Sequence, residues 1–252
     1  YTTIDNPELY FQTKLYTGTG SELAVTLDGD ENMQPDLVWS KNRDQSEGHK
    51  IFDSVRGVTK FIMSNNNDAE STAAQTLKSF DSDGATIGTD ADMNTSSEKN
   101  VLWCWKAGGS ASTNSSGSTD SSVSVNTDSG VSIVGYTGAG ATTYGHGLGA
   151  TPNVIIIKKR TSDSGNNNWF VLHDAIITAG GSNKSFMTLN ETGALASNGS
   201  ATTFTSASST TFGVGTDDII SESSHTFIAY CFTEKQGYSK FGSYTGNANA
   251  DG

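Results

Sequence analysis

A short motif that occurs three times in one chain constrains the fold more than any other feature of this sequence. Residues 16–20 read YTGTG, residues 136–140 read YTGAG, and residues 244–248 read YTGNA. A second pair of motifs lies downstream, where GTD at residues 88–90 and 215–217 precedes an aromatic-Cys-aromatic triplet at the same spacing. Because several matches recur in the same order, we predict two diverged copies of one module of roughly a hundred residues.

The repeat predicts the organisation of the whole chain. We expect a lead-in over residues 1–13, a first module over 14–109, a linker over 110–122, a second module over 123–240, and a last segment over 241–252. The linker is almost wholly Gly, Ser, Thr, Asn and Asp, a composition typical of a flexible connection. The last segment is either a closing strand of the second module or the start of a third repeat, and we favour the start of a third repeat in a natural chain that continues.

Each module has the pattern of an all-β protein. Apolar runs of four to eight residues alternate with turn clusters rich in Gly and Asn, and they predict strands at residues 23–27, 37–39, 60–63, 101–105, 154–158, 186–189 and 226–232. Short strands spaced by such turns favour two tandem antiparallel β-sandwich or jelly-roll-like modules. Large residues on both faces of the runs at 101–106 and 225–232 predict central strands that are covered on both sides.

The charge of the chain excludes two classes of partner. Its 15 basic residues against 27 acidic ones give a formal net charge of -12. Such a chain repels nucleic acid and anionic membranes, so we expect neither as a partner. The densest basic run, at residues 158–160, directly follows an apolar strand, and we interpret it as the exit of that strand.

The aromatic-Cys-aromatic triplets are predicted to lie in the core. Equivalent positions in two modules should lie far apart, so Cys104 and Cys231 are expected to be small buried side chains rather than a disulfide. No further ligands at short spacing accompany them, which argues against zinc. The predicted structural core comprises Trp103, Cys104, Trp105, Tyr230, Cys231 and Phe232.

The polar residues give one candidate ligand site and no catalytic one. No histidine accompanies a recognisable nucleophile and acid, and no pair of carboxylates stands out from the turns, so we predict that the chain is not an enzyme and needs no cofactor. Two acidic clusters, with Asp28 and Asp30 in one and Asp81 and Asp83 in the other, could supply oxygen ligands to a structural calcium ion. We favour the simpler interpretation, in which these residues form ordinary hairpin turns.

One tryptophan is a candidate for binding a sugar. Trp169 follows an Asn-rich stretch at residues 165–168 and is the aromatic residue most expected to be exposed. An aromatic face suits the apolar face of a pyranose. The apolar residues that follow Trp169 also allow the simpler interpretation, in which it begins a strand.

Several motifs together resemble a known family. They are residues 16–20 (YTGTG), 34–39 (QPDLVW), 52–57 (FDSVRG), 79–84 (SFDSDG), 103–109 (WCWKAGG), 145–149 (GHGLG) and 237–246 (GYSKFGSYTG). The combination is similar to a repeat module of unknown function in structural proteins of marine tailed bacteriophages.

That resemblance implies a place on the virion surface, outside the cell, in a tail fibre or surface appendage that contributes to host-surface attachment. The implied partners are other virion proteins, further copies of the chain in a homo-oligomer such as a trimer, and a host-surface glycan. The alternative is a capsid or tail decoration or spacer protein with no ligand. A third and less favoured interpretation is a polysaccharide depolymerase.

Overall fold

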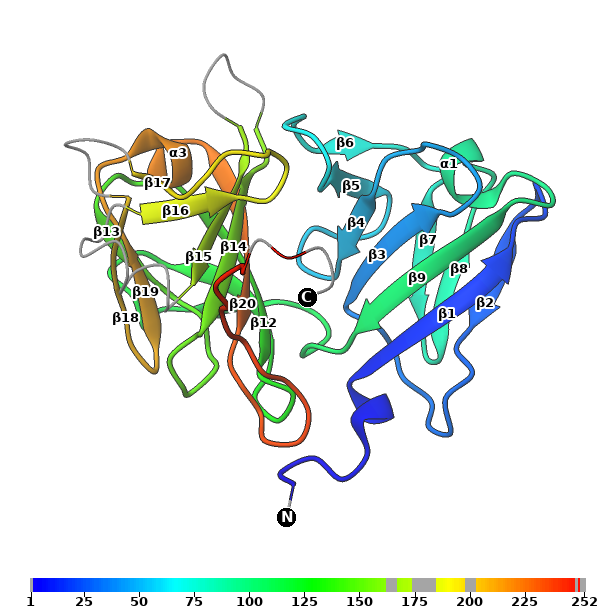
Figure 1. Cartoon of the computed structure of the whole chain (residues 1–252), viewed down its shortest axis with the longest axis horizontal. Coiled ribbons are helices and arrows are strands. Elements are labelled where there is room, and N and C mark those ends of the chain that lie inside the picture. The colour runs from blue at the N-terminus through cyan, green and yellow to red at the C-terminus, as the bar shows by residue number, and fades with distance from the viewer. Residues whose placement is uncertain (1, 162–166, 174–184, 198–202, 248, 250–252) are drawn as a thin grey trace.

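The protein is all-β, with strands grouped into antiparallel sheets. The computed structural model describes residues 2–161, 167–173, 185–197, 203–247 and 249. Figure 1 shows two modules side by side, with the N-terminal module in blue through cyan to green and the C-terminal module in green to orange. In the described residues each module contains one large and one small sheet, and the predicted fold class is confirmed.

Module 1 consists of two facing sheets. Its large sheet has the order β1 (Phe11–Thr17), β9 (Lys99–Trp105), β3 (Leu37–Asn42), β4 (Lys50–Asp53), β5 (Lys60–Met63) and β6 (Ser71–Thr72). Its small sheet has the order β2 (Leu23–Thr26), β8 (Gly84–Ile87) and β7 (Leu77–Asp81). Two short helices, η1 (Pro7–Leu9) and α1 (Ala91–Asn94), precede β1 and β9.

Module 2 has the same design with two added strands. Its large sheet has the order β10 (Ser112–Asn114), β11 (Ser121–Asn126), β12 (Val131–Thr137), β20 (Thr226–Phe232), β14 (Val154–Lys159), β15 (Trp169–His173), β16 (Ser185–Thr188) and β17 (Ala196–Ser197). Its small sheet has the order β13 (Thr142–Gly145), β19 (Thr211–Val214) and β18 (Phe204–Ala207). The helix α3 (Asp218–Ser221) precedes β20, as α1 precedes β9.

The two large sheets share strand order and register. From β12 onward, the strands of module 2 follow the order of the strands of module 1 from β1 onward. Trp105 is paired with Leu37, and the matching Phe232 is paired with Val154. This agreement is what a duplication predicts, while the duplication itself stays a prediction.

The tyrosines of the repeated motif perform the same task in both modules. The Tyr16 hydroxyl donates a hydrogen bond to the backbone oxygen of Met93 at 2.7 Å. The Tyr136 hydroxyl donates to the backbone oxygen of Ile220 at 2.9 Å. Tyr16 therefore ties β1 to the short helix before β9, and Tyr136 ties β12 to the short helix before β20.

The glycines of the motif are required by close approach. A Cβ atom on Gly18 would lie 2.1 Å from the backbone oxygen of Thr95, and one on Gly138 would lie 2.1 Å from that of Glu222. Only glycine allows two backbones to come this close.

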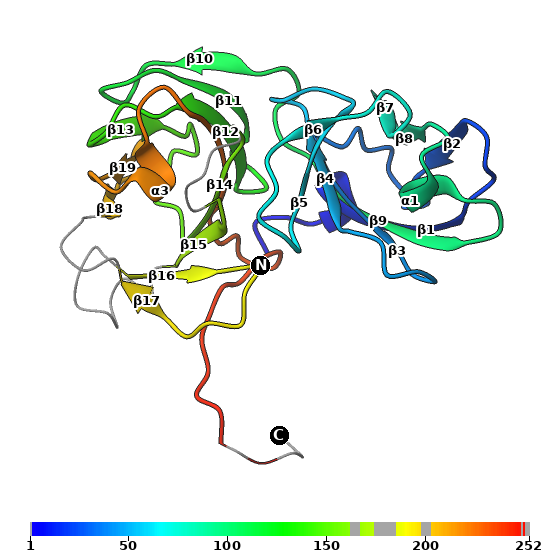
Figure 2. The same ribbon diagram turned by 90° about the horizontal axis from the view of Figure 1, so that it is seen from above.

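The core of the molecule has three layers of apolar contact between four sheets. One cluster fills module 1 and includes Cys104, and a second fills module 2 and includes Cys231. A third cluster lies where the two large sheets face each other, so both central strands are covered on both faces, as predicted. Figure 2 shows the resulting order, with the two large sheets in the middle and the small sheets outside.

The structure corrects the predicted module boundaries. Residues 110–122 are not a flexible linker, because they contain β10 and the start of β11, which pairs with β12. Alternating Ser and Val let β11 turn Val123 into the core, while the Ser121 hydroxyl donates to the oxygen of Gly145 at 2.7 Å. Module 1 begins within the expected lead-in, since β1 starts at Phe11. The described part of the segment 241–252 forms no strand.

Candidate functional site

The two modules share an apolar interface that makes them a single folding unit. The buried residues of this interface are Leu37, Ile51, Ile62, Ala107, Ile133, Trp169, Ile228 and Tyr230. Except for Ala107, which follows β9, they come from the two large sheets, on the faces turned away from the small sheets. Without the other module these faces would be exposed. Burial of such a surface is strongly favourable, so the modules are expected to remain docked.

A buried ion pair of module 1 lies at this interface and is contacted from module 2. The Arg56 Nε atom lies 2.5 Å from Asp53 Oδ2, and both side chains are fully buried. The Tyr230 hydroxyl, from module 2, donates to the same Asp53 oxygen at 2.7 Å. Burial alone would lower the pKa of Arg56, but Asp53, Tyr230 and Glu70 together outweigh burial and raise it, so the guanidinium stays charged.

The basic run at residues 158–160 holds the modules together at their edge. Arg160 forms a bidentate pair with Glu70 of module 1, with distances of 2.9 and 3.0 Å. The buried Lys158 donates to the backbone oxygen of Asn67 at 3.2 Å. The run continues β14 into the interface, which the sequence interpretation of a simple strand exit missed.

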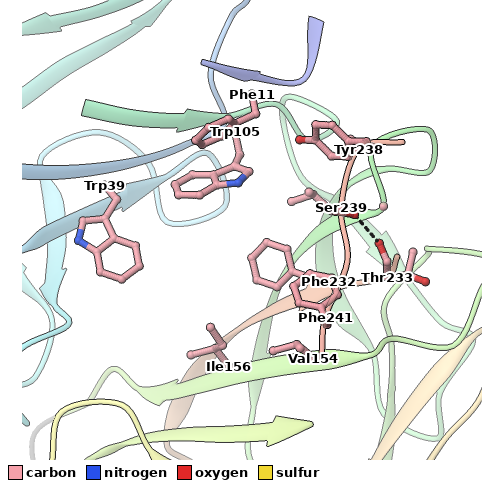
Figure 3. Close-up of a pocket in the computed structure, with 13 residues that line it drawn as sticks. Phe11, Trp39, Trp105, Val154, Ile156, Phe232, Thr233, Tyr238, Ser239 and Phe241 are labelled. Carbon is pink, nitrogen blue, oxygen red and sulfur yellow. Dashed lines mark hydrogen bonds between the residues drawn. The ribbon is translucent and has the colours of Figure 1, made fainter. Parts of the chain in front are cut away.

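An aromatic groove opens beside the shared core. It encloses about 380 Å³. Figure 3 shows aromatic side chains of module 1 on one side and residues of module 2 and the segment after it on the other. We name the aromatic groove by its lining residues, which are Phe11, Trp39, Trp105, Ser129, Gly130, Val131, Val154, Ile156, Phe232, Thr233, Tyr238, Ser239 and Phe241.

Aromatic pairs build both walls of the groove. The ring centroids of Phe11 and Trp105 are 4.8 Å apart, and those of Phe232 and Phe241 are 6.1 Å apart. These separations lie within the range of favourable aromatic packing, so the rings hold one another in place. Burial raises the pKa of Tyr238 to about 12, and its hydroxyl is therefore neutral at physiological pH.

The four tryptophans divide into two with bonded indole N–H groups and two without. Trp39 donates to His49 Nδ1 at 3.0 Å, and Trp169 donates to the backbone oxygen of Met63 at 2.8 Å. Within the described residues the indole N–H groups of Trp103 and Trp105 have no acceptor, and neither is a sealed buried atom. Trp105 thus presents an available donor in the aromatic groove.

The expectation that Trp169 is exposed is wrong. Its side chain is 1% exposed and stacks over Tyr230 with ring centroids 6.4 Å apart. The simpler interpretation holds, because Trp169 begins β15. It belongs to the interface between the modules, which no pattern within one module could reveal.

The predicted core residues separate by face. Cys104 and Cys231 are buried inside the two sandwiches, and burial raises the pKa of both thiols. Tyr230 is buried on the opposite face, in the cluster between the two large sheets, and the half-buried Trp105 and Phe232 pack against that cluster. Trp103 is also half-buried. The match across the repeat therefore includes residues of the face that meets the other module.

The four candidate calcium ligands have separate surroundings. Asp28 pairs with Lys14 at 2.9 Å. Asp81 accepts from two hydroxyls of its own hairpin, and Asp83 accepts from the backbone amide of Met33. No group of three or more His, Cys, Asp or Glu side chains that could hold a metal occurs among the described residues. In the same part of the chain no helix is long and apolar enough to cross a membrane.

The comparisons with known proteins identify a family. A family model described as a domain of unknown function (DUF7483) matches residues 6–252. The chain therefore belongs to the DUF7483 family, and a single match spans both modules. No curated protein and no solved structure matches.

Proposed function

We propose that this chain is a bacteriophage virion structural protein, of a tail fibre or surface appendage, that contributes to attachment to host-surface glycan. The observation that carries the attachment role is the aromatic groove, which lies between two modules that share a buried apolar cluster. The virion assignment depends on the sequence motifs that resemble phage structural proteins.

The architecture supports a mechanical and adhesive task. The shared core and the pair between Arg160 and Glu70 bind the modules into one block, so a surface groove between them keeps its shape. A site formed in advance loses little conformational freedom when a ligand binds. The groove also combines apolar walls with hydroxyl groups, and such mixed surfaces are common at binding sites.

The proposal is tested on virions and on host cells. An antibody raised against this chain should label the tail tip or fibre ends of purified virions in negative-stain images. The purified chain should bind host cells, and periodate treatment of the cell surface, which cleaves vicinal diols of sugars, should abolish binding. Virions without label, or binding that survives periodate, would count against the respective half of the proposal.

A purely structural role is the second candidate. It is favoured by the use of Trp169 and Tyr230, two of the largest aromatic side chains, to pack one module on the other. A spacer or decoration protein of this kind would bind only virion proteins. Label spread over the capsid, together with no binding to host cells, would support this role and remove the attachment role.

A further inference from the structure

We propose that the aromatic groove binds a neutral pyranose through stacking on Trp105 and hydrogen bonds to the Trp105 indole N–H and the Tyr238 hydroxyl. This inference rests on the proposed attachment function and names its ligand class and its site. The cavity of about 380 Å³ lies near the lower end of the ~300–1,000 Å³ typical of small-molecule sites. It therefore suits one or two sugar rings rather than a long apolar ligand.

The chemistry of the groove is divided between two kinds of surface. Phe11, Trp39 and Trp105 form an aromatic wall from module 1. Among the hydroxyl-bearing lining residues, Ser129, Thr233 and Ser239 already donate to backbone oxygens of the protein. The polar groups left for a ligand are the Trp105 indole N–H and the Tyr238 hydroxyl. A pyranose suits this division, because it has an apolar face of C–H groups and a rim of hydroxyls. A purely aliphatic ligand would leave both polar groups unpaired.

Two polar groups in the groove are available to a ligand. Neither the Trp105 indole N–H nor the Tyr238 hydroxyl has a hydrogen-bond partner in the described residues. Figure 3 shows the Trp105 nitrogen on the side where Phe232 and Ser239 lie, and the Tyr238 hydroxyl toward Phe11 and Trp105. A sugar hydroxyl can both donate and accept, so it can satisfy either group.

The uncharged lining of the groove favours neutral sugars over acidic ones. None of the lining residues is charged, and the chain as a whole carries a formal net charge of -12. A sialylated or uronic-acid glycan would find no cation in the groove and would approach a negative molecule. We therefore expect lactose to bind and sialyllactose to bind more weakly.

The test uses saturation-transfer NMR and tryptophan fluorescence on the full chain. The probes are cellobiose, maltose, lactose, N-acetyllactosamine and 3′-sialyllactose. Trp105→Ala should weaken binding of the neutral sugars at least about tenfold, as expected for a central aromatic contact. Trp105→Phe, which keeps a ring but loses the N–H, should fall between Trp105→Ala and the parent.

Two further variants keep the test decisive. Trp103→Ala is the matched control, because Trp103 is half-buried on the same strand but does not line the groove, and it should bind like the parent. Phe241→Ala removes a groove ring beyond the last strand, so it should weaken binding even if Trp105→Ala fails to fold.

Four results would overturn the inference. They are no binding to any neutral probe, tighter binding of 3′-sialyllactose, equal effects of the variants at Trp103 and Trp105, and unchanged binding by Phe241→Ala. The attachment function is judged separately by adsorption to host cells. If the parent and Trp105→Ala adsorb equally well, the groove is excluded and the attachment function stands. If the parent does not adsorb, the attachment function itself fails.

Discussion

Replacing Arg56 with methionine should strongly destabilise the protein. The substitution keeps a long apolar side chain but removes the cation that pairs with Asp53, whose side chain is fully buried. It also leaves the backbone oxygen of Ile51 without the Arg56 donor at 2.8 Å. Breaking a buried ion pair by removing one partner costs about 3–5 kcal/mol. The free energy of unfolding should fall by that amount.

The effect is large on the scale of a melting experiment. At about 2–4 °C per kcal/mol for chains of this size, the expected fall in Tm is roughly 6–20 °C. Differential scanning calorimetry at neutral pH gives the shift directly. Because the modules share a core, both parent and variant should melt in one transition.

The matched control is Arg160→Met at the edge of the same interface. Arg160 and Glu70 are 19% and 14% exposed, so their pair is partly solvated, and Glu70 keeps a second contact with Arg56 at 3.4 Å. Partly solvated pairs contribute about 1 kcal/mol or less. An Arg56→Met protein that melts within about 2 °C of the parent, or no more than 2 °C below Arg160→Met, would refute the account of the buried pair.

Three further predictions concern the repeat, the thiols and pH. Gly138→Ala should destabilise the protein by more than about 1 kcal/mol in urea unfolding, because the new Cβ atom would lie 2.1 Å from a backbone oxygen. Gly246→Ala should be neutral, because nothing lies within 4 Å of the position of its Cβ atom. Equal effects of the two variants would show that the close approach does not matter. Burial raises the pKa of Cys104 to about 12, and it also raises the pKa of Cys231. Neither thiol should therefore react with Ellman's reagent until the protein unfolds. Rapid reaction of the native chain would contradict the burial of the two cysteines. Burial lowers the pKa of His146, so the unfolded chain binds the proton more readily than the folded chain. Stability should therefore be full above about pH 6.5 and decline as the pH falls below it. The decline in Tm with falling pH should be smaller in His146→Gln, and an equal decline in parent and variant would contradict the assignment.

The sequence by itself determined the all-β class and most of the strands. Alternating apolar runs predicted the central strands, including β9 and β20, because a strand covered on both faces needs large side chains on both. The Tyr-Thr-Gly motif and the two matched cysteines indicated corresponding positions in the two modules. They could do so because hydrogen bonds and close backbone contacts within a module require specific residues. The residues that interact at these positions all lie within one module.

Only the tertiary structure decided which face of each large sheet meets the other module. Trp169 and Trp105 both lie in strands flanked by apolar residues, yet one is sealed in the interface and the other lines the aromatic groove. Asp53 and Tyr230 are separated by 177 residues in the sequence, and nothing local to either indicates that they share a hydrogen bond. Docking of two sheets depends on the shape and charge of entire faces. A pattern read along one strand records which residues can be buried, but not what buries them.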